Sequence, residues 1–223
     1  MLKIYTQPQI EKIIAGQAEW LASLERMYGI PRACIQAVLF KEMSDTDILD
    51  ILADFAVKCY WIKFDALSFF RRILKKPPLR DFPGGLLKKR DSSIGYAQIF
   101  GYVAIRAIHF SFSHGLDGDL ASFNLPARKS LDEKNPADLR LIWRKLNQDP
   151  AFNLRMAALN LISAAEEMTG RIDFSSYTPE EFQLIFTRYN ADSRSITAYG
   201  RETYQCFLSF SQSSQEYLRS KAS

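Results

Sequence analysis

The chain has 223 residues, of which 47% are hydrophobic and 13% aromatic, and 29 Lys and Arg against 25 Asp and Glu leave a formal net charge of +4. This length favours a single domain with one well-filled core, and the composition argues against disorder except in the polar tail, residues 209–223. No apolar stretch reaches the length of a membrane span, because Lys58, Lys63 and Asp65 interrupt the richest one, residues 48–74.

The first element that the sequence predicts is a helix over residues 7–28, which ends at Gly29. The residues before it lack the apolar core and the cleavage site of a secretory signal peptide. We therefore expect synthesis in the cytoplasm, and action outside it would require another route, such as a membrane hole or a secretion machine. Cys34, Cys59 and Cys206 are odd in number and lie in apolar runs, so we expect buried free thiols.

The second predicted helix, which begins at Pro31, turns a glutamate toward its buried side. Ile35, Val38 and Leu39 repeat at helical spacing, and Glu42 continues the same stripe. Burial disfavours the charged form of a carboxyl, so Glu42 should have a raised pKa and hold a proton near neutrality, as a general acid must. The alternative is a structural glutamate at a helix end, turned to solvent or paired with a Lys or Arg.

Residues 48–74 predict a long apolar helix. We expect this helix to lie in the core, and an amphipathic helix on a membrane surface is the alternative. After this helix, Pro77, Pro78, Pro83, Gly84 and Gly85 predict a loop. Residues 71–90, which include this loop, hold eight basic residues and one acidic residue. This basic segment either attracts an anionic polymer or is a solvated surface. Residues 86–93 are the only candidate for a short β-hairpin.

A Gly-x-x-Gln pattern, made by Gly95, Tyr96 and Gln98, follows the loop. It opens a new apolar run, so we predict that it lies on a helix over residues 93–110. Prolines that follow capping residues predict the starts of three later helices, at Pro136, Pro150 and Pro179.

The helix that follows the last of these prolines ends in Tyr189 and Asn190, and Tyr199 and Gly200 open the next one. The order of the motifs, from Glu42 through Gly-x-x-Gln to the Tyr-Asn and Tyr-Gly pairs, resembles the lysozyme-like superfamily. The similarity is greatest to soluble lytic transglycosylases and goose-type lysozymes. It implies an all-α, lysozyme-like fold with helical insertions and at most a minor β-hairpin.

The resemblance implies one lysozyme-like domain over residues 1–223, in which the helix 7–28 and the tail 209–223 are peripheral. The chain departs from the family pattern at two motifs. Met43 stands directly after the glutamate, where the family usually has the serine that is here Ser44, and the middle pair of the Gly-x-x-Gln pattern is Tyr-Ala rather than Leu-Met. The gaps between the motifs are longer than usual, which is why insertions are expected.

For function, the resemblance implies a lytic transglycosylase or muramidase that cleaves the β-1,4 bond between N-acetylmuramic acid and N-acetylglucosamine in peptidoglycan, in the periplasm or cell wall. It implies no cofactor and no metal. Glu42 would be the catalytic acid, with Tyr189 and Asn190 supporting it. The residues that would bind the glycan strand are Gly95, Tyr96, Gln98 and Ser44. Asp91 is the candidate second carboxylate, although lytic transglycosylases use a single glutamate.

A non-catalytic helical binding protein is the alternative to an enzyme. It would be a degenerate relative that holds glycan, or a nucleic-acid binder that uses the basic segment, with nucleic acid the less favoured partner. His109 and His114, the only histidines, lack the spacing of a zinc site. The sequence leaves the oligomeric state open.

Overall fold

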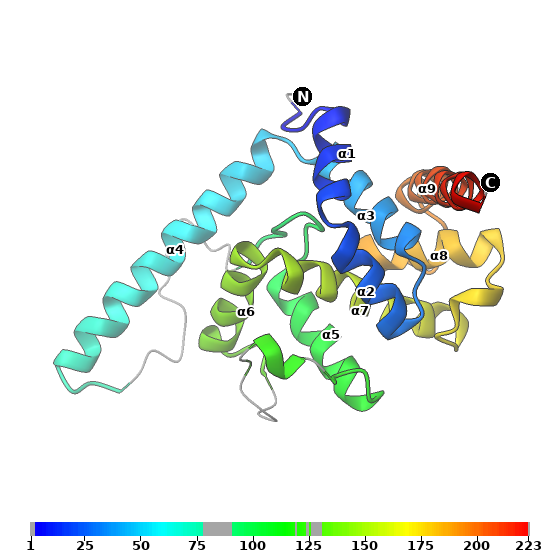
Figure 1. The fold of residues 1–223 in the computed structure, drawn as a ribbon. Coiled ribbons are helices and arrows are strands. Elements are labelled where there is room, and N and C mark those ends of the chain that lie inside the picture. The colour runs from blue at the N-terminus through cyan, green and yellow to red at the C-terminus, as the bar shows by residue number, and fades with distance from the viewer. Residues whose placement is uncertain (1–2, 78–90, 119, 124, 126–130, 223) are drawn as a thin grey trace. The chain divides into compact units, whose positions relative to one another are not determined.

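The computed structural model describes residues 3–77, 91–118, 120–123, 125 and 131–222. Within these residues every regular element is a helix, so the all-α prediction is confirmed (Figure 1). The only β-type pairing described there is an isolated antiparallel bridge between Ile94 and Ile99. None of the helices in this part of the chain is long and apolar enough to cross a membrane.

The chain divides into two compact units. One, here called the central unit, is Asp47–Asn153, and the other, the terminal unit, combines Lys3–Thr46 with the chain from Leu154 onward. The helix α7 begins in the central unit and continues in the terminal unit, because it spans Pro150–Thr169. This division does not test the expectation of a single domain, which stays a prediction.

In the terminal unit, α3 packs against three other helices, α1, α2 and α9, and α9 also packs against α8. The bounds are α1 Gln7–Gly16, α2 Ala18–Tyr28, α3 Arg32–Asp45, α8 Pro179–Asn190 and α9 Ala198–Ala222. The predicted single helix over residues 7–28 is wrong, since Gln17, with φ −101° and ψ 8°, separates α1 from α2. The expectation of disorder in the tail is wrong for residues 209–222, which continue α9, and Ser223 lies outside the described residues.

In the central unit, α5, Gly101–Ser113, packs against α6, Pro136–Gln148, and a short 3-10 turn covers Leu120–Phe123. The long helix α4, Ile48–Ile73, is capped by Asp47, whose carboxylate accepts from two backbone N–H groups of the first turn.

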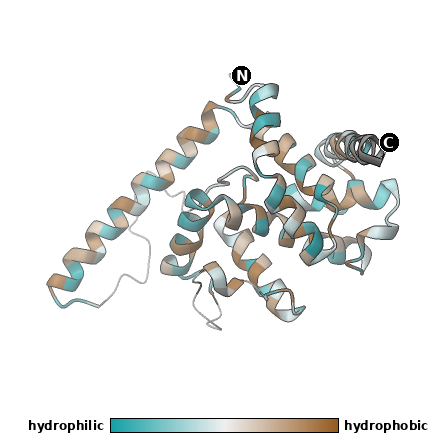
Figure 2. Ribbon diagram, in the orientation of Figure 1, coloured by the Kyte–Doolittle hydropathy of each residue, from teal (hydrophilic) through white to brown (hydrophobic). Residues whose placement is uncertain are grey.

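Apolar residues recur along the whole length of α4 (Figure 2). Val57, Trp61 and Phe64 are buried, whereas Phe55 and Ile62 are 63% and 69% exposed. The expectation of a core helix is therefore correct for one face of α4 and wrong for the other.

Residues 91–100 form a tight turn before α5 rather than the start of a helix. Gly95 and Gln98 have φ values of +77° and +45°, which a right-handed helix does not allow. Both carboxylate oxygens of Asp91 accept backbone N–H groups at 2.9 Å, from Gly101 and Tyr102, and so mark where α5 begins. The first part of the helix predicted over residues 93–110 is therefore wrong.

Two expectations fall partly outside the described residues. The structure does not describe residues 86–90 of the candidate hairpin. It also does not describe Arg80, Lys88, Lys89 and Arg90 of the basic segment. The described basic residues of this segment, Arg71, Arg72, Lys75 and Lys76, lie at the end of α4 and just beyond it.

The three cysteines are free thiols. Cys34 is buried as predicted, and burial followed by the negative charge of Glu25 raises the pKa of its thiol. Cys59 on α4 and Cys206 on α9 are only half-buried, so the expectation of burial is wrong for these two.

Candidate active site

Glu42 lies in the last turns of α3, in the terminal unit. The helix begins after Pro31 as predicted, and Ile35, Val38 and Leu39 on it are fully buried. Glu42 continues their stripe; the residue as a whole is partly exposed, whereas its carboxyl group is buried. The helix therefore holds this carboxyl at the edge of the core, where it is largely removed from water.

Two helices bring hydrogen-bond donors to this carboxyl. The Tyr199 hydroxyl, near the start of α9, donates to Glu42 Oε1 at 2.6 Å. Asn190, the last residue of α8, makes a further side-chain hydrogen bond to Glu42. The backbone carbonyl of Glu42 accepts from the Thr46 hydroxyl at 2.8 Å, beyond the end of α3. Segments more than 140 residues apart in the sequence thus meet at one carboxyl group.

Burial raises the pKa of Glu42 from 4.5 to about 7. Loss of hydration is the largest cause, and the hydrogen bond from Tyr199 opposes it by stabilising the carboxylate. The negative charge of Asp45 raises the pKa further, while the positive charge of Lys41 and the hydrogen bond from Asn190 lower it. Near neutral pH both protonation states of Glu42 are populated, so the group can donate a proton and also accept one.

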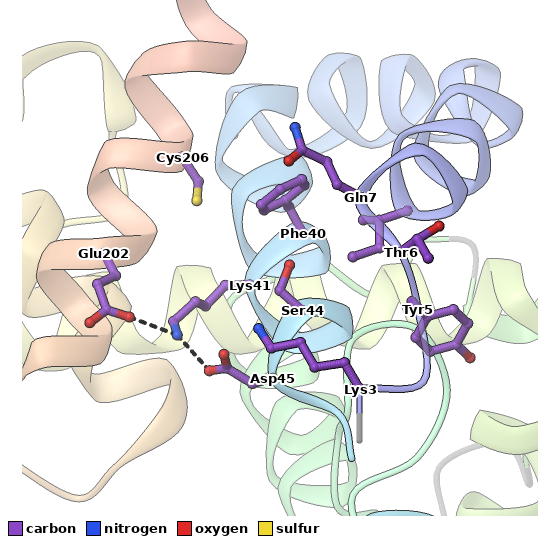
Figure 3. A pocket seen from close by; sticks show the side chains of 11 residues that line it. Lys3, Tyr5, Thr6, Gln7, Phe40, Lys41, Ser44, Asp45, Glu202 and Cys206 are labelled. Atoms are coloured by element: carbon purple, nitrogen blue, oxygen red, sulfur yellow. Dashed lines mark hydrogen bonds and ion pairs between the residues drawn. The ribbon is translucent and has the colours of Figure 1, made fainter. Parts of the chain in front are cut away.

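Lys41, the residue before Glu42, connects α3 to α9. Its Nζ lies 2.5 Å from Asp45 Oδ2 and 2.8 Å from Glu202 Oε2 (Figure 3). It also lies 5.7 Å from the centre of the Tyr199 ring. These contacts and the hydrogen bond from Tyr199 to Glu42 hold the first turns of α9 against the end of α3.

A pocket of about 560 Å³ lies beside these ion pairs in the terminal unit. Its wall is formed by residues before α1, by the first turn of α1, by the C-terminal half of α3 and by α9 (Figure 3). Ser44, which the resemblance implies as a glycan-binding residue, is on this wall together with Lys41 and Glu202. Glu42 itself is not part of the lining.

Tyr189, the tyrosine that the resemblance implies as support, is buried near the end of α8. Burial, and after it the negative charge of Glu42, hold the pKa of Tyr189 well above its ordinary range. A hydrogen bond from Tyr189 to the glutamate stays a prediction. The tyrosine with a defined bond to Glu42 is Tyr199, to which sequence reasoning assigned no role although it belongs to the Tyr-Gly pair.

Gly200 explains how Tyr199 can approach α8 and α3 so closely. A Cβ atom at position 200 would lie 2.1 Å from Thr187 Oγ1 and 2.4 Å from the carbonyl oxygen of Gln183, both on α8. The Thr187 hydroxyl also accepts the backbone N–H of Thr197 at 3.1 Å. The glycine therefore permits a close contact between α8 and α9 that places Tyr199 at the carboxyl.

Gly200→Ala should destabilise the protein by about 2 kcal/mol, because the added methyl group overpacks a backbone contact that cannot move freely. Chemical denaturation measures the loss. Gly16→Ala is the matched control, since a Cβ there meets nothing within 4 Å, and it should leave stability unchanged or slightly higher. Equal effects of the two substitutions would contradict the close contact.

The Gly-x-x-Gln residues lie in the central unit, where they stabilise their own turn. A Cβ at Gly95 would lie 2.3 Å from Nδ2 of the buried Asn153. That side chain donates to the Ile94 carbonyl at 2.9 Å and accepts from the Ala97 N–H at 3.0 Å. Gln98 Nε2 donates to the Gly95 carbonyl at 2.8 Å. These contacts account for the glycine and the glutamine locally.

The other predicted site residues of the central unit are Tyr96 and Asp91. Tyr96 is half-buried in the turn, and Asp91 holds the first backbone N–H groups of α5. A cleft that combines Gly95, Tyr96 and Gln98 with Glu42 stays a prediction, and so does a catalytic role for Asp91.

No protein-family model matches the chain, and neither a curated protein nor a solved structure does. Within the described residues, no group of three His, Cys, Asp or Glu side chains is arranged to hold a metal ion. Function is therefore inferred from the motif order and from the geometry around Glu42.

Removing the hydroxyl that donates to Glu42 should raise the pKa of this carboxyl. Tyr199→Phe deletes a bond that favours the charged form, so Glu42 should keep its proton to a higher pH than the wild-type value of about 7. Carbon-13 NMR of the glutamate carboxyls, with Glu42→Gln to assign the signal, measures the change. An unchanged or lower pKa in Tyr199→Phe would contradict the assigned hydrogen bond.

Proposed function

We propose that this protein is a peptidoglycan-cleaving glycosidase of the lytic transglycosylase or lysozyme type, with Glu42 as its single general acid and base. The observation that carries the proposal is the Glu42 carboxyl, which has a pKa of about 7 and accepts a hydrogen bond from Tyr199 at 2.6 Å. A group that must donate a proton and then recover one works best when its pKa lies near the working pH.

In the proposed reaction, protonated Glu42 donates its proton to the oxygen that links N-acetylmuramic acid to the next sugar. The bond from this oxygen to the muramic acid C1 breaks, and the oxygen leaves as a hydroxyl. The Glu42 carboxylate then takes a proton from the 6-hydroxyl of the same muramic acid, whose oxygen forms the new bond to C1. In the lysozyme variant a water molecule replaces that hydroxyl. Either route returns the proton to Glu42 and needs no cofactor.

The neighbours of Glu42 have separate parts in this proposal. Tyr199 and Asn190 orient the carboxyl and stabilise its charged form after the first proton transfer. Ser44, and Gly95, Tyr96 and Gln98 in the central unit, are proposed to contact the glycan strand. The site of action would be the periplasm or cell wall.

Purified sacculi test the proposal directly. The wild-type protein should release soluble muropeptides, and mass spectrometry should identify their ends, since an anhydro end is lighter than a hydrolysed end by one water. The activity should fall as pH rises through about 7, where Glu42 loses its proton. Binding to sacculi without any release would favour the non-catalytic glycan-binding protein instead.

A further inference from the structure

The helix α4 presents apolar side chains to solvent on the face opposite its buried one. Val57, Tyr60, Trp61 and Phe64 are the buried residues, all at most 8% exposed. The exposed face carries a continuous line of residues, here called the α4 stripe: Ile48, Leu52, Phe55, Cys59, Ile62, Ala66, Phe69 and Ile73. The six large aliphatic and aromatic side chains among them are between 48% and 69% exposed. Monomeric proteins rarely leave such a long apolar surface uncovered.

The spacing of the α4 stripe indicates what covers it. From Ile48 to Ile73, the step from one member to the next is alternately four and three positions in the sequence. This is the seven-residue repeat of a coiled coil, in which an apolar seam of period 3.5 follows a second helix. A lipid surface requires only a broad apolar face with the ordinary helical period. The strict repeat therefore favours another helix as the occupant.

We propose that the α4 stripe binds α4 of a second copy of this chain, as an antiparallel coiled coil. The stripe is symmetric about the midpoint between Tyr60 and Trp61, so reversing a second α4 about this point places its members opposite one another. Ile48 then faces Ile73 of the second copy, and Phe55 faces Ala66 of the second copy. Large residues meet large ones at the ends, and Phe55 meets the smallest residue of the stripe.

The charges beside the α4 stripe select this orientation. Lys58 and Asp65 each stand one residue before a stripe member, so both lie on the same side of the stripe. In the antiparallel pair this side of one copy adjoins the same side of the other, so Lys58 lies beside Asp65 of the second copy, and the symmetric contact repeats the same attraction. In a parallel pair, Lys58 would face Lys63 of the second copy and be repelled. Lys58 and Lys63 are exposed, and the Asp65 side chain is 43% exposed although it also pairs with Arg140 in its own unit. Its carboxylate can accept both cations.

The apolar residues that flank the stripe agree with the same orientation. In the antiparallel pair, Leu49 faces Phe70 of the second copy, and these side chains are 60% and 59% exposed. The pair would therefore cover apolar surface beyond the stripe itself. This association is independent of the proposed glycosidase activity, since Glu42 lies in the terminal unit and α4 in the central unit.

Sedimentation equilibrium of the 223-residue chain tests the proposal, with a mass of twice 25.6 kDa expected. Phe55→Glu combined with Ile62→Glu should raise the dissociation constant of the dimer by at least about 100-fold, since charged groups are costly at buried seam positions. Both side chains are exposed in the monomer, so circular dichroism should show an unchanged helix content. Phe112→Glu, at an apolar residue of α5 that is 44% exposed, is the control and should leave the dimer intact.

Two matched charge reversals test the orientation. Lys58→Glu should weaken the antiparallel dimer, because it places an acidic side chain against Asp65 of the second copy, whereas it would strengthen a parallel one. Lys63→Glu should have little effect, because Lys63 faces Ala56 of the second copy in the antiparallel pair. A wild-type chain that stays monomeric up to about 100 μM, far above the Kd of a specific interface, would overturn the proposal. So would a monomer that binds phosphatidylglycerol vesicles through the α4 stripe, or a dimer that Lys58→Glu strengthens.

Discussion

Glu42→Gln should lower the rate of release of muropeptides from sacculi by about 10² to 10⁴-fold, the range that proton transfer by a positioned side chain contributes. Glutamine has nearly the same shape, and its amide oxygen can still accept the hydrogen bond that Tyr199 donates to Glu42 Oε1. It cannot supply the proton that turns the glycosidic oxygen into a leaving group. The loss should therefore appear in turnover, while binding to sacculi remains.

Dye release from labelled sacculi measures turnover, and a pull-down on unlabelled sacculi measures binding. Glu11→Gln is the matched control, because Glu11 is an exposed glutamate of α1 in the same unit, whose carboxylate accepts a hydrogen bond from Gln7. It should keep wild-type activity. A Glu42→Gln variant that still clears sacculi at near the wild-type rate would remove Glu42 from catalysis and, with it, the main reason for proposing an enzyme.

Glu42→Gln should also make the protein more stable than the wild type above neutral pH. The pKa of Glu42 is about 7 in the folded chain against 4.5 for an ordinary glutamate. Below pH 4.5 the group is protonated in both states and has no effect. As pH rises from 4.5 to 7, the unfolded chain releases this proton first, so the wild-type fold loses stability. Each pKa unit corresponds to about 1.4 kcal/mol, so the full loss is roughly 3 kcal/mol.

Chemical denaturation at several pH values measures this linkage. The difference in unfolding free energy between Glu42→Gln and the wild type should grow from about pH 4.5 to 7 and then stay constant, reaching roughly 3 kcal/mol. Glu11→Gln should show no such trend. A constant difference across this range would mean that the Glu42 carboxyl titrates normally and is not held in a desolvated site. This result is independent of any activity on glycan.

Much of the helix pattern could be predicted from local sequence. Pro136 and Pro179 each follow a capping residue, and α6 and α8 begin at these prolines. Thr178 also forms a capping box with Glu181. The position of Glu42 on the apolar stripe of α3 could be predicted in the same way. These features follow from the period of the helix and from backbone groups within four residues, so they need no distant contact.

The turn at Gly95 shows where local periodicity fails. An apolar run from residue 93 has helical spacing, but the buried side chain of Asn153 binds the backbone at Ile94 and Ala97. Those two hydrogen bonds, together with the positive φ at Gly95 and Gln98, hold a turn that the helical pattern does not indicate. Asn153 is more than 50 positions away from this turn. The residues next to the turn in the sequence therefore cannot predict it.

The sequence by itself determined that this is an all-helical protein and that Glu42 stands on the apolar side of α3, since both follow from side-chain periodicity. Only the tertiary structure showed that Tyr199 binds Glu42. Tyr199 reaches the carboxyl because Gly200 lets α9 approach α8 at Thr187, and such a contact depends on the packing of helices distant in sequence. The same reason applies to α4: its pattern is apolar on both sides, and only packing shows that Trp61 is covered while Ile62 is exposed.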